Sequence, residues 1–439
     1  MTNKLKVSFL TLGCKVNQTE SEALNQLLTS EGYEVVQEAE GPDVVIINTC
    51  TVTGTGSSKS RKVIRRMAKE HPLSTIAVMG CYSQTQPEEV SQIEGVDLVL
   101  GTQDRATILY HLRKLAEQKQ EKHLKERKPV LAVRDFESQA EYEELPLIEG
   151  ESRVRAMLKI QDGCSQFCTY CIVPYARGPA RSRSSEKVIS EARKLLEAGH
   201  KEIILTGIHT GAYGKDQAGM DLSKLISQLA ELPNLLRLRI SSIEPIEFSE
   251  DLLTAVTSHQ EVCPHFHIPL QSGSDSVLTR MKRPYRVDDY ARLLNRIREK
   301  LPQAALTTDV MTGFPGETEI EHEQSLKFIE SCEFAGIHVF PYSRRTGTIA
   351  AEMSNQLPRS IKTARVQEII ALGQKSRANY IKQFIGYPLE VLVEKIEEDG
   401  SAQGHTPNYL EIRFPGSLNP GDWQVGQIIK HPLKHEHIV

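Results

Sequence analysis

Buried apolar runs alternate with amphipathic stretches along most of the chain. In the first 115 residues, short β-branched runs predict strands, and each is followed by a stretch with the apolar period of a helix. The predicted strands are 6–12, 43–48, 75–79 and 96–100, and the predicted helices are 18–30, 58–70, 87–93 and 104–115. Such alternation favours a parallel sheet, so we predict an open parallel-sheet α/β domain over residues 1–115.

A second alternation begins at residue 153. Its predicted strands are 155–161, 202–206, 236–241, 264–268, 306–312 and 337–342, each followed by a helical segment. A closed barrel of eight βα units takes about 250 residues. Six units in residues 153–385 therefore predict an incomplete (β/α)6 barrel, and the last helical segment, 360–384, leads out of it.

Two further segments have other patterns. Residues 116–152 contain a charged run, 117–128, and an acidic run, 137–151, which predict a charged linker. In residues 386–439, apolar and charged positions alternate, and Gly and Pro separate the runs. This pattern predicts a small antiparallel β module of barrel or OB-like type.

Composition places the chain among soluble, folded proteins. Of its 439 residues, 25% are charged and 39% hydrophobic, unlike disordered, fibrous or membrane-spanning chains. No apolar run approaches the ~18 residues that a bilayer crossing needs, and residues 1–12 lack a signal-peptide pattern, so we expect a cytoplasmic protein. The net charge of −4 is uneven, because residues 153–385 carry +5. A polyanionic partner is expected there.

Eight cysteines in a reducing compartment indicate ligands, catalysts or buried thiols instead of disulfides. Only Cys164, Cys168 and Cys171 are close in sequence, in the loop after the first strand of the second alternation, at the barrel end that carries chemistry. Three soft thiolates suit an iron-sulfur cluster, zinc or copper(I). Structural zinc needs four protein ligands, so a centre with one open position fits better. Simple burial and a zinc knuckle completed from elsewhere are the alternatives.

Three scattered cysteines share a placement. Cys14, Cys50 and Cys81 each follow a predicted strand by one or two residues. The carboxyl ends of strands in an open parallel sheet define its binding crevice, so these thiols can converge on a second cluster. Free cysteines are also among the most buried residues, so separate burial stays open. Cys263 and Cys332 lack this placement and are predicted to be packing residues.

These motifs carry a resemblance to a known family. The CxxxCxxC loop, with Tyr170 before its last cysteine, resembles the radical S-adenosylmethionine enzymes. The runs LGCKVN at 12–17, NTCTVT at 48–53 and GCYSQ at 80–84 resemble the three cysteine motifs of the methylthiotransferases. The domain order also matches, with the C-terminal module similar to a TRAM module. The first motif, with TGIHTG at 206–211, resembles the type that acts on threonylcarbamoyladenosine in tRNA.

The resemblance implies a tRNA modification enzyme that methylthiolates C2 of N6-threonylcarbamoyladenosine at position 37, in the anticodon stem-loop. It implies two [4Fe-4S] clusters, a catalytic one on Cys164, Cys168 and Cys171, and one on Cys14, Cys50 and Cys81 that carries or donates sulfur. S-adenosylmethionine would supply both the methyl group and the radical. A low-potential donor such as flavodoxin or ferredoxin would supply electrons, without a membrane partner.

Two other functions stay open. One is a related methylthiotransferase acting on isopentenyladenosine in tRNA or on a ribosomal protein. The other is a non-catalytic, metal-dependent RNA-binding protein with zinc in the cysteine loop.

Polar residues and a glycine near the barrel strand ends are candidate contacts to S-adenosylmethionine. A glycine lets backbone approach the methionine end, and polar groups bond the ribose or carboxylate. For each residue, a turn or a cap is the structural alternative. The candidates are Gly207, Ser241, Glu244, Gln271, Ser272 and Asp309.

Basic residues gather after four predicted strand ends, where phosphates would approach. For each cluster, a solvated charged face is the alternative. The C-terminal module is predicted to bind RNA as a TRAM-like module. It is net acidic, so its overall electrostatic field would not attract RNA, and local basic patches or its shape must account for the binding. The candidate RNA-binding residues are Arg61, Arg65, Arg66, Arg181, Arg183, Arg280, Lys282, Arg283, Arg344 and Arg345.

Overall fold

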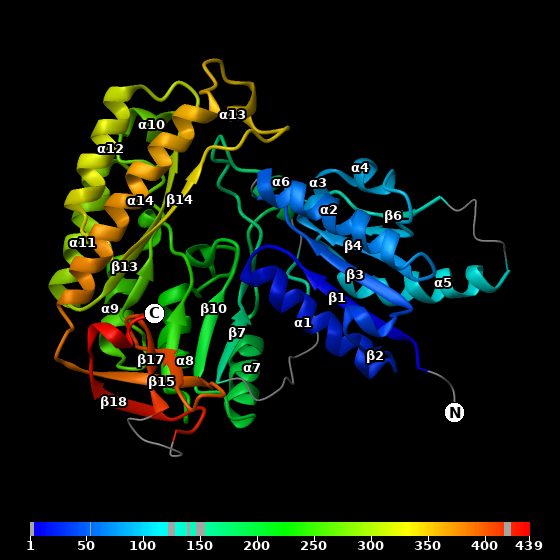
Figure 1. Ribbon diagram of the computed structural model, residues 1–439, viewed down its shortest axis with the longest axis horizontal. Helices are drawn as coiled ribbons and strands as arrows, with labels where there is room; N and C mark the ends of the chain where they lie inside the picture. The colour runs from blue at the N-terminus through cyan, green and yellow to red at the C-terminus, as the bar shows by residue number, and fades with distance from the viewer. Residues whose placement is uncertain (1–3, 53, 122–127, 138–140, 146–153, 417–422) are drawn as a thin grey trace.

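The structure is a computed structural model that describes residues 4–52, 54–121, 128–137, 141–145, 154–416 and 423–439. Figure 1 shows an N-terminal α/β part beside a larger α/β part, with a small β module packed against one end of the larger part. No helix in the described ranges combines the length and the apolar character that a membrane crossing requires.

The N-terminal part is a six-stranded parallel sheet in the order β2-β1-β3-β4-β5-β6. Every residue of β3 and β4 is buried, as expected for a parallel sheet covered on both faces. Its strands are β1 (Lys6–Thr11), β2 (Glu34–Val35), β3 (Val44–Thr49), β4 (Thr75–Gly80), β5 (Leu98–Leu100) and β6 (Val130–Ala132). Its helices are α1 (Lys15–Ser30), η1 (Glu38–Glu40), α2 (Gly54–Glu70), α3 (Cys81–Thr85), α4 (Pro87–Ser91), η2 (Arg105–Thr107) and α5 (Ile108–Glu121).

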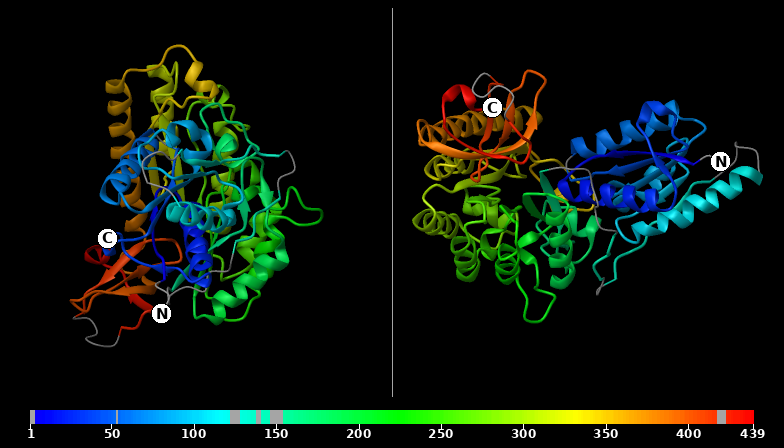
Figure 2. Two further views of the ribbon diagram at one scale, coloured as in Figure 1. Left: turned by 90° about the vertical axis from the view of Figure 1, so that its right-hand side faces the viewer. Right: turned by 90° about the horizontal axis from the view of Figure 1, so that it is seen from below.

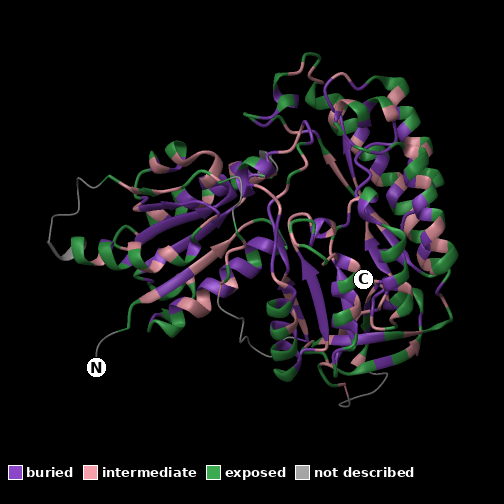
Figure 3. Ribbon diagram, turned by 180° about the vertical axis from the view of Figure 1, so that it is seen from behind, coloured by how far each residue is buried: buried purple, intermediate pink, exposed green. Residues whose placement is uncertain are grey.

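Two apolar clusters hold these helices on opposite faces of the sheet. Leu24 and Leu28 of α1 and Leu112 of α5 pack with one face, whereas Ile64 and Met67 of α2 pack with the other. Figure 3 shows the buried strands between the two helix layers. This arrangement confirms the predicted open α/β fold.

The chain between residues 116 and 152 is more ordered than a linker where the structure describes it. Helix α5 continues to Glu121, and β6 extends the N-terminal sheet by pairing with β5. The sequence pattern did not predict β6, because a strand of three residues between charged runs is too short to give a periodic signal. Parts of the expected linker, 122–127, 138–140 and 146–152, lie outside the described residues.

The larger part has six parallel strands in chain order. They form two three-stranded sheets, β7-β10-β11 and β12-β13-β14, joined by the bridge between Leu238 and Val262. The predicted incomplete barrel is confirmed. The strands are β7 (Arg155–Lys159), β10 (Glu202–Thr206), β11 (Arg237–Ile240), β12 (His265–His267), β13 (Ala305–Thr312) and β14 (Gly336–Pro341), with a separate hairpin of β8 (Gln161–Asp162) and β9 (Arg181–Ser182).

The barrel helices cover its outer surface and enclose one large apolar core (Figures 1 and 2). Cys332 lies in that core, and Cys263 is also buried, which confirms both as packing residues. The helices are α6 (Val173–Arg177), α7 (Ser185–Glu197), η3 (Thr210–Ala212), α8 (Leu222–Ala230), η4 (Pro245–Glu247), α9 (Glu250–Ser258), α10 (Asp275–Arg280), α11 (Val287–Lys300), α12 (Glu319–Ser331), α13 (Ile349–Glu352) and α14 (Arg359–Lys382).

Helix α14 leads into the C-terminal module, an antiparallel sheet in the order β17-β16-β15-β18. Its core includes Tyr380 and Phe384 at the end of α14. The guanidinium of Arg239 donates to the carbonyl oxygen of Pro407 at 3.0 Å, so the module docks on the barrel. Its elements are β15 (Pro388–Ile396), β16 (Ala402–His405), β17 (Glu411–Phe414), β18 (Ile428–Pro432) and η6 (His435–His437).

Candidate active site

The three scattered cysteines come together at the carboxyl ends of adjacent strands. Cys14 caps the start of α1 after β1, Cys50 follows β3, and Cys81 begins α3 directly after β4. Strands β1, β3 and β4 are neighbours, so the three cysteines lie at one edge of the sheet, and their convergence on one cluster stays a prediction. The chain approaches Cys50 closely at Gly13, where a Cβ would lie 2.8 Å from the Cys50 Cβ and 3.0 Å from its Sγ. With a φ of 101° at this position, glycine is the residue that fits.

Asn17 and Arg177 bind this group of thiols. The Asn17 amide donates to the carbonyl oxygens of Leu12 and Thr49 at 2.8 and 3.0 Å, so it ties two strand ends together. Its Oδ1 accepts from the Cys14 thiol at 3.8 Å and from Arg177 at 2.5 Å. The Nε of Arg177 also donates to the Cys81 Sγ at 3.1 Å.

Burial favours the protonated form of the Cys50 and Cys81 thiols when no metal is bound. Desolvation raises the pKa of Cys50 and raises that of Cys81 to about 12, while the nearby Arg177 charge opposes both shifts. Metal ligation requires thiolates, so metal binding here would release protons. Arg177 supplies positive charge that favours the ligated form.

The second group of thiols lies in the loop between β8 and α6. Arg283 donates to the Cys168 Sγ at 3.3 Å, and His209 Nδ1 lies 3.5 Å from the Cys164 Sγ. Desolvation alone would lower the pKa of His209, but hydrogen bonds to Cys164 and Glu247 raise it to about 10. Desolvation raises the pKa of Cys171 to about 12. Both groups of thiols therefore have a cationic side chain against sulfur.

Helix α6 joins the two cysteine groups. It begins two residues after Cys171, packs against α3, which starts with Cys81, and ends with Arg177. Beside it, Cys14 and Val173 line one cavity of about 1160 Å³. Helix α6 therefore links the loop of Cys164, Cys168 and Cys171 to the chain around Cys81, and Cys14 is the one of the six cysteines found among the residues that line this cavity in the described part of the chain.

A buried ion cluster fixes the N-terminal part to the barrel. Glu20 Oε1 lies 2.8 Å from Arg105, 2.7 Å from Lys159 and 2.5 Å from Arg177. Burial alone would raise the pKa of Glu20, but these three cations lower it to about 2. Asp162 pairs with the same three side chains, so the charges are compensated on both sides of the contact.

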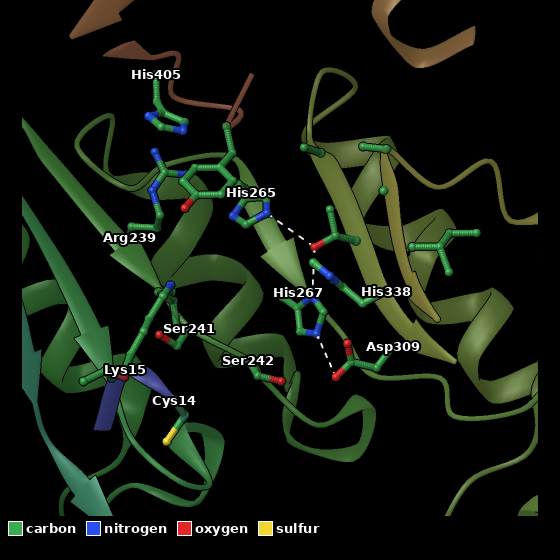
Figure 4. Close-up of a pocket in the computed structure, with 18 of the residues that line it drawn as sticks. Cys14, Lys15, Arg239, Ser241, Ser242, His265, His267, Asp309, His338 and His405 are labelled. Atoms are coloured by element: carbon green, nitrogen blue, oxygen red, sulfur yellow. Dashed lines mark hydrogen bonds and ion pairs between the residues drawn. The ribbon is translucent and has the colours of Figure 1, made fainter. Parts of the chain in front are cut away.

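The cavity holds half of the residues predicted to contact S-adenosylmethionine. Gly207, Ser241 and Asp309 line it, and Figure 4 shows Ser241 and Asp309 on its wall. His267 Nε2 lies 3.2 Å from the Asp309 carboxylate. A Cβ at Gly207 would lie 3.0 Å from the Gln161 side-chain oxygen, so glycine suits this close approach.

The other three predicted cofactor contacts are not among the residues that line this cavity. Glu244 forms an ion pair with Arg283, the side chain that also donates to Cys168. Gln271 is buried, and Ser272 lies 3.2 Å from the Ser325 hydroxyl. Glu244 therefore contacts the cysteine loop through Arg283, and Ser272 has a packing partner.

Four of the predicted RNA-binding residues are buried, and this contradicts their predicted contact with phosphate. Arg181 pairs with Asp162, Arg183 with Glu144 and Glu191, and Arg283 with Glu244. A buried, paired guanidinium cannot reach an RNA backbone. The sequence does not reveal these partners, because most of them come from distant segments.

Arg345 is the fourth buried residue of that set. It is 8% exposed, donates to the Ser57 hydroxyl at 3.2 Å and lies within electrostatic range of Cys50. Its Nε and second terminal nitrogen have no hydrogen-bond partner among the described residues. It therefore faces the N-terminal thiols instead of solvent.

The remaining predicted RNA contacts lie at the surface. Arg65, Arg66, Lys282 and Arg344 are exposed, although Arg66 also pairs with Glu38. Arg61 and Arg280 are half-buried and pair with Glu89 and Glu321. Contact between the four exposed residues and RNA phosphates stays a prediction.

The donor sets fit iron-sulfur clusters better than single zinc ions. In the described part of the chain, neither cysteine group has three ligand atoms mutually within 4.8 Å. Tetrahedral zinc with bonds of about 2.3 Å would hold its thiolates about 4 Å apart. Wider groups of three thiolates suit a polynuclear cluster. For a polar ligand, the buried Ser241 hydroxyl and Gln271 Oε1 offer hydrogen-bonding atoms that have no partner in the described residues.

Sequence reasoning missed several residues of this site. Asn17 and Lys15 lie in the first cysteine motif and His209 in the 206–211 motif, so their position in a motif was an available signal. Arg177 was not among the candidate site residues. Its contact with Cys81 depends on how two distant parts of the chain pack.

Comparisons with known proteins agree with the division of the chain into an N-terminal α/β part and a larger barrel part. Residues 6–101 match the family model described as "Uncharacterized protein family UPF0004", and residues 158–329 match that of the "Radical SAM superfamily". The chain is similar to the threonylcarbamoyladenosine tRNA methylthiotransferase MtaB of Bacillus subtilis, at 43% identity over 97% of this chain and 92% of that protein. A protein of the same description from Aquifex aeolicus is 35% identical over 95% and 98%.

A second type of relative and two solved structures are also similar. The tRNA-2-methylthio-N(6)-dimethylallyladenosine synthase of Carboxydothermus hydrogenoformans is 35% identical over 96% of this chain and 94% of that protein. The radical S-adenosylmethionine methyltransferase TsrM from Kitasatospora setae has a TM-score of 0.59 at 16% identity, covering 80% and 77% of the two chains. The cobalamin-dependent enzyme OxsB has a TM-score of 0.53 at 14% identity, covering 87% and 56%. These two structures support the fold alone.

Proposed function

The chain belongs to the tRNA methylthiotransferases of the radical S-adenosylmethionine superfamily, and we propose that it methylthiolates C2 of threonylcarbamoyladenosine at position 37 of tRNA. Its similarity to the two threonylcarbamoyladenosine enzymes extends over nearly the whole chain. The observation that carries the proposal is that Arg177, six residues after the last cysteine of the loop group, donates to Cys81 of the N-terminal group, close to the cavity that Cys14 lines.

The cofactors are two [4Fe-4S] clusters and S-adenosylmethionine. When bound, they supply a 5′-deoxyadenosyl radical, a methyl group and sulfur, which ordinary acid-base side chains cannot provide for an aromatic C–H. We assign Cys164, Cys168 and Cys171 to the cluster that cleaves S-adenosylmethionine, and Cys14, Cys50 and Cys81 to the cluster that carries or donates sulfur.

The protein's own side chains position and compensate these groups. Arg283 and His209 contact loop sulfurs, and Arg177 contacts Cys81, so cations lie where ligation creates thiolates. Arg345 adds a buried charge beside Cys50. Because helix α6 follows the loop cysteines and packs against α3, which begins with Cys81, the base would meet sulfur close to where the radical acts.

Three cavity residues are our proposed contacts to S-adenosylmethionine. Gly207 allows backbone approach, and Ser241 and Asp309 offer a hydroxyl and a carboxylate on the wall. Gln271 has a buried amide oxygen available for the same ligand. We assign Glu244 an indirect role through Arg283.

The tRNA contact is proposed for the exposed cations Arg65, Arg66, Lys282 and Arg344, whose charges suit phosphates. RNA binding by the C-terminal module is proposed for its outer face, because the carbonyl oxygens of Thr406 and Pro407 accept from Arg239 of the barrel. An anticodon stem-loop substrate, a low-potential donor such as flavodoxin or ferredoxin, and a cytoplasmic location complete the proposal.

The test is a product analysis with the anaerobically reconstituted enzyme. Three stem-loop RNAs that differ only at position 37, with threonylcarbamoyladenosine, isopentenyladenosine or adenosine, are incubated with S-adenosylmethionine and reductant. Nucleosides are then separated and identified by mass spectrometry. We expect the methylthio product from the threonylcarbamoyl RNA alone. Product from the isopentenyl RNA instead, or 5′-deoxyadenosine without any modified RNA, would overturn the substrate assignment.

A further inference from the structure

Lys15 places a cation without a partner on the wall of the cavity. It is the first residue of α1, directly after Cys14, and it is exposed into the cavity that it lines. Figure 4 shows its side chain extending toward Ser241. In the described part of the chain, its ammonium makes no hydrogen bond or ion pair.

The other charged side chains near the Lys15 end of the cavity have ionic or hydrogen-bonding partners. Arg239 pairs with Glu202 and also donates to the carbonyl oxygens of the C-terminal module. Asp309 pairs with His267, and the Glu411 carboxylate accepts from Gln403 at 2.6 Å. Burial lowers the pKa of Lys15, and the charges of Arg155 and Arg239 act in the same direction, whereas Tyr409 and Glu202 oppose them. Neither carboxylate of the cavity lining, Asp309 or Glu411, pairs with Lys15 in the described part of the chain, so a bound anion would give its ammonium a partner.

The position of Lys15 next to Cys14 limits which anion could bind its ammonium. Consecutive Cα atoms are about 3.8 Å apart, so the Lys15 ammonium lies within one extended side chain of a thiol that we assign to the sulfur-carrying cluster. A base whose C2 reacts beside that cluster would have its N6 substituent within the same distance range. A threonylcarbamoyl substituent ends in a carboxylate, whereas an isopentenyl substituent is apolar.

We propose that Lys15 binds the carboxylate of the threonylcarbamoyl group and so selects this substrate over bases with an uncharged N6 substituent. The inference rests on the proposed function and adds a specificity-determining residue to it. A hydrogen bond between an ammonium and a carboxylate is charge-assisted and is roughly twice as strong as one between neutral groups. A base with an uncharged N6 substituent would leave the Lys15 ammonium without a partner. The enzyme would therefore discriminate against that base, because the bound state lacks the ionic hydrogen bond.

A second cation on the cavity lining provides an internal comparison. Arg377 lies on α14, which packs against β14, and has no ion pair among the described residues. Lys15 instead neighbours the barrel side that holds Arg155 and Arg239. Arg377→Met therefore tests whether any cation of the cavity lining can select the carboxylate. Lys327 is exposed on the outer helix α12, so Lys327→Met is the surface control.

The experiment compares two stem-loop RNAs on the reconstituted holoenzyme, one with threonylcarbamoyladenosine and one with its carboxamide. The measured quantity is the ratio of kcat/KM values for the two RNAs, with dissociation constants determined in parallel. We expect the wild-type protein to favour the carboxylate by about tenfold to a hundredfold. Lys15→Met should bring the ratio close to one, mainly through weaker binding of the carboxylate RNA. Lys15→Arg, Arg377→Met and Lys327→Met should keep the preference.

The outcomes separate this inference from the proposed function. Because both RNAs are tested on the same preparation, the ratio does not depend on cluster loading. An unchanged ratio in Lys15→Met, equal losses for both RNAs, or loss of the preference in Arg377→Met would overturn the role of Lys15. If the wild-type protein modifies neither RNA but modifies an isopentenyl stem-loop, the proposed function fails instead.

Discussion

The Nε of Arg177 lies 3.1 Å from the Sγ of Cys81, although one residue belongs to the barrel and the other to the N-terminal sheet. Arg177 follows the last loop cysteine by six residues. Its guanidinium also bonds Asn17 and Glu20 of α1. One side chain thus connects the cysteine loop, the second group of thiols and the helix that carries Lys15.

Arg177→Met should destabilise the protein strongly. Arg177 is fully buried, and its removal leaves the Glu20 carboxylate with less compensating charge. Breaking one partner of a buried ion pair costs about 3–5 kcal/mol. Urea unfolding of the anaerobic protein measures this loss, with exposed Arg344→Met as the control. Equal stability of the two variants would show that the buried contact does not hold the parts together.

The Glu20 cluster predicts a loss of stability in acid. Glu20 has a pKa lowered from 4.5 to about 2 in the folded protein, so its contribution is present above about pH 4.5. It is lost as the pH falls from 4.5 toward 2, by an amount on the order of 3 kcal/mol. Urea midpoints measured across this range should fall for the wild-type protein.

Glu20→Gln is the control for this pH dependence. The variant should be less stable at neutral pH, because Arg105 and Arg177 lose a charged partner. Its urea midpoint should change less between pH 4.5 and pH 2, with the remaining slope due to other carboxylates such as Asp162. Parallel wild-type and variant curves would contradict the assignment to Glu20.

Neighbouring arginines give a matched test of the RNA surface. Arg344 is exposed, whereas Arg345 is buried beside Cys50. Arg344→Met should weaken stem-loop binding and reduce the slope of log Kd against log salt by about 0.7 to 1. Arg345→Met should leave that slope unchanged, because its guanidinium does not face solvent. A reduced slope in Arg345→Met would restore the original expectation that it contacts phosphate.

The sequence predicted those features that depend on local pattern or strand order. Cys14, Cys50 and Cys81 were expected to converge because each follows a strand of one parallel sheet, and the structure has them on adjacent strands. Strand β6 was missed because its three residues lie between charged runs. Arg181, Arg183 and Arg283 were assigned to RNA because charge along the chain does not reveal that each is buried and paired with a carboxylate. Such partners are set by tertiary packing.

The central claim is that two separate groups of three cysteines each hold an iron-sulfur cluster beside one cavity. It is tested most directly by iron and sulfide analysis of three anaerobic proteins. These are the wild type, the Cys14→Ala, Cys50→Ala, Cys81→Ala variant and the Cys164→Ala, Cys168→Ala, Cys171→Ala variant, each also assayed for 5′-deoxyadenosine. We predict about half of the wild-type iron in each variant. Only the N-terminal variant should still cleave S-adenosylmethionine, without modifying RNA. Full iron in the N-terminal variant, or continued cleavage in the loop variant, would contradict the account.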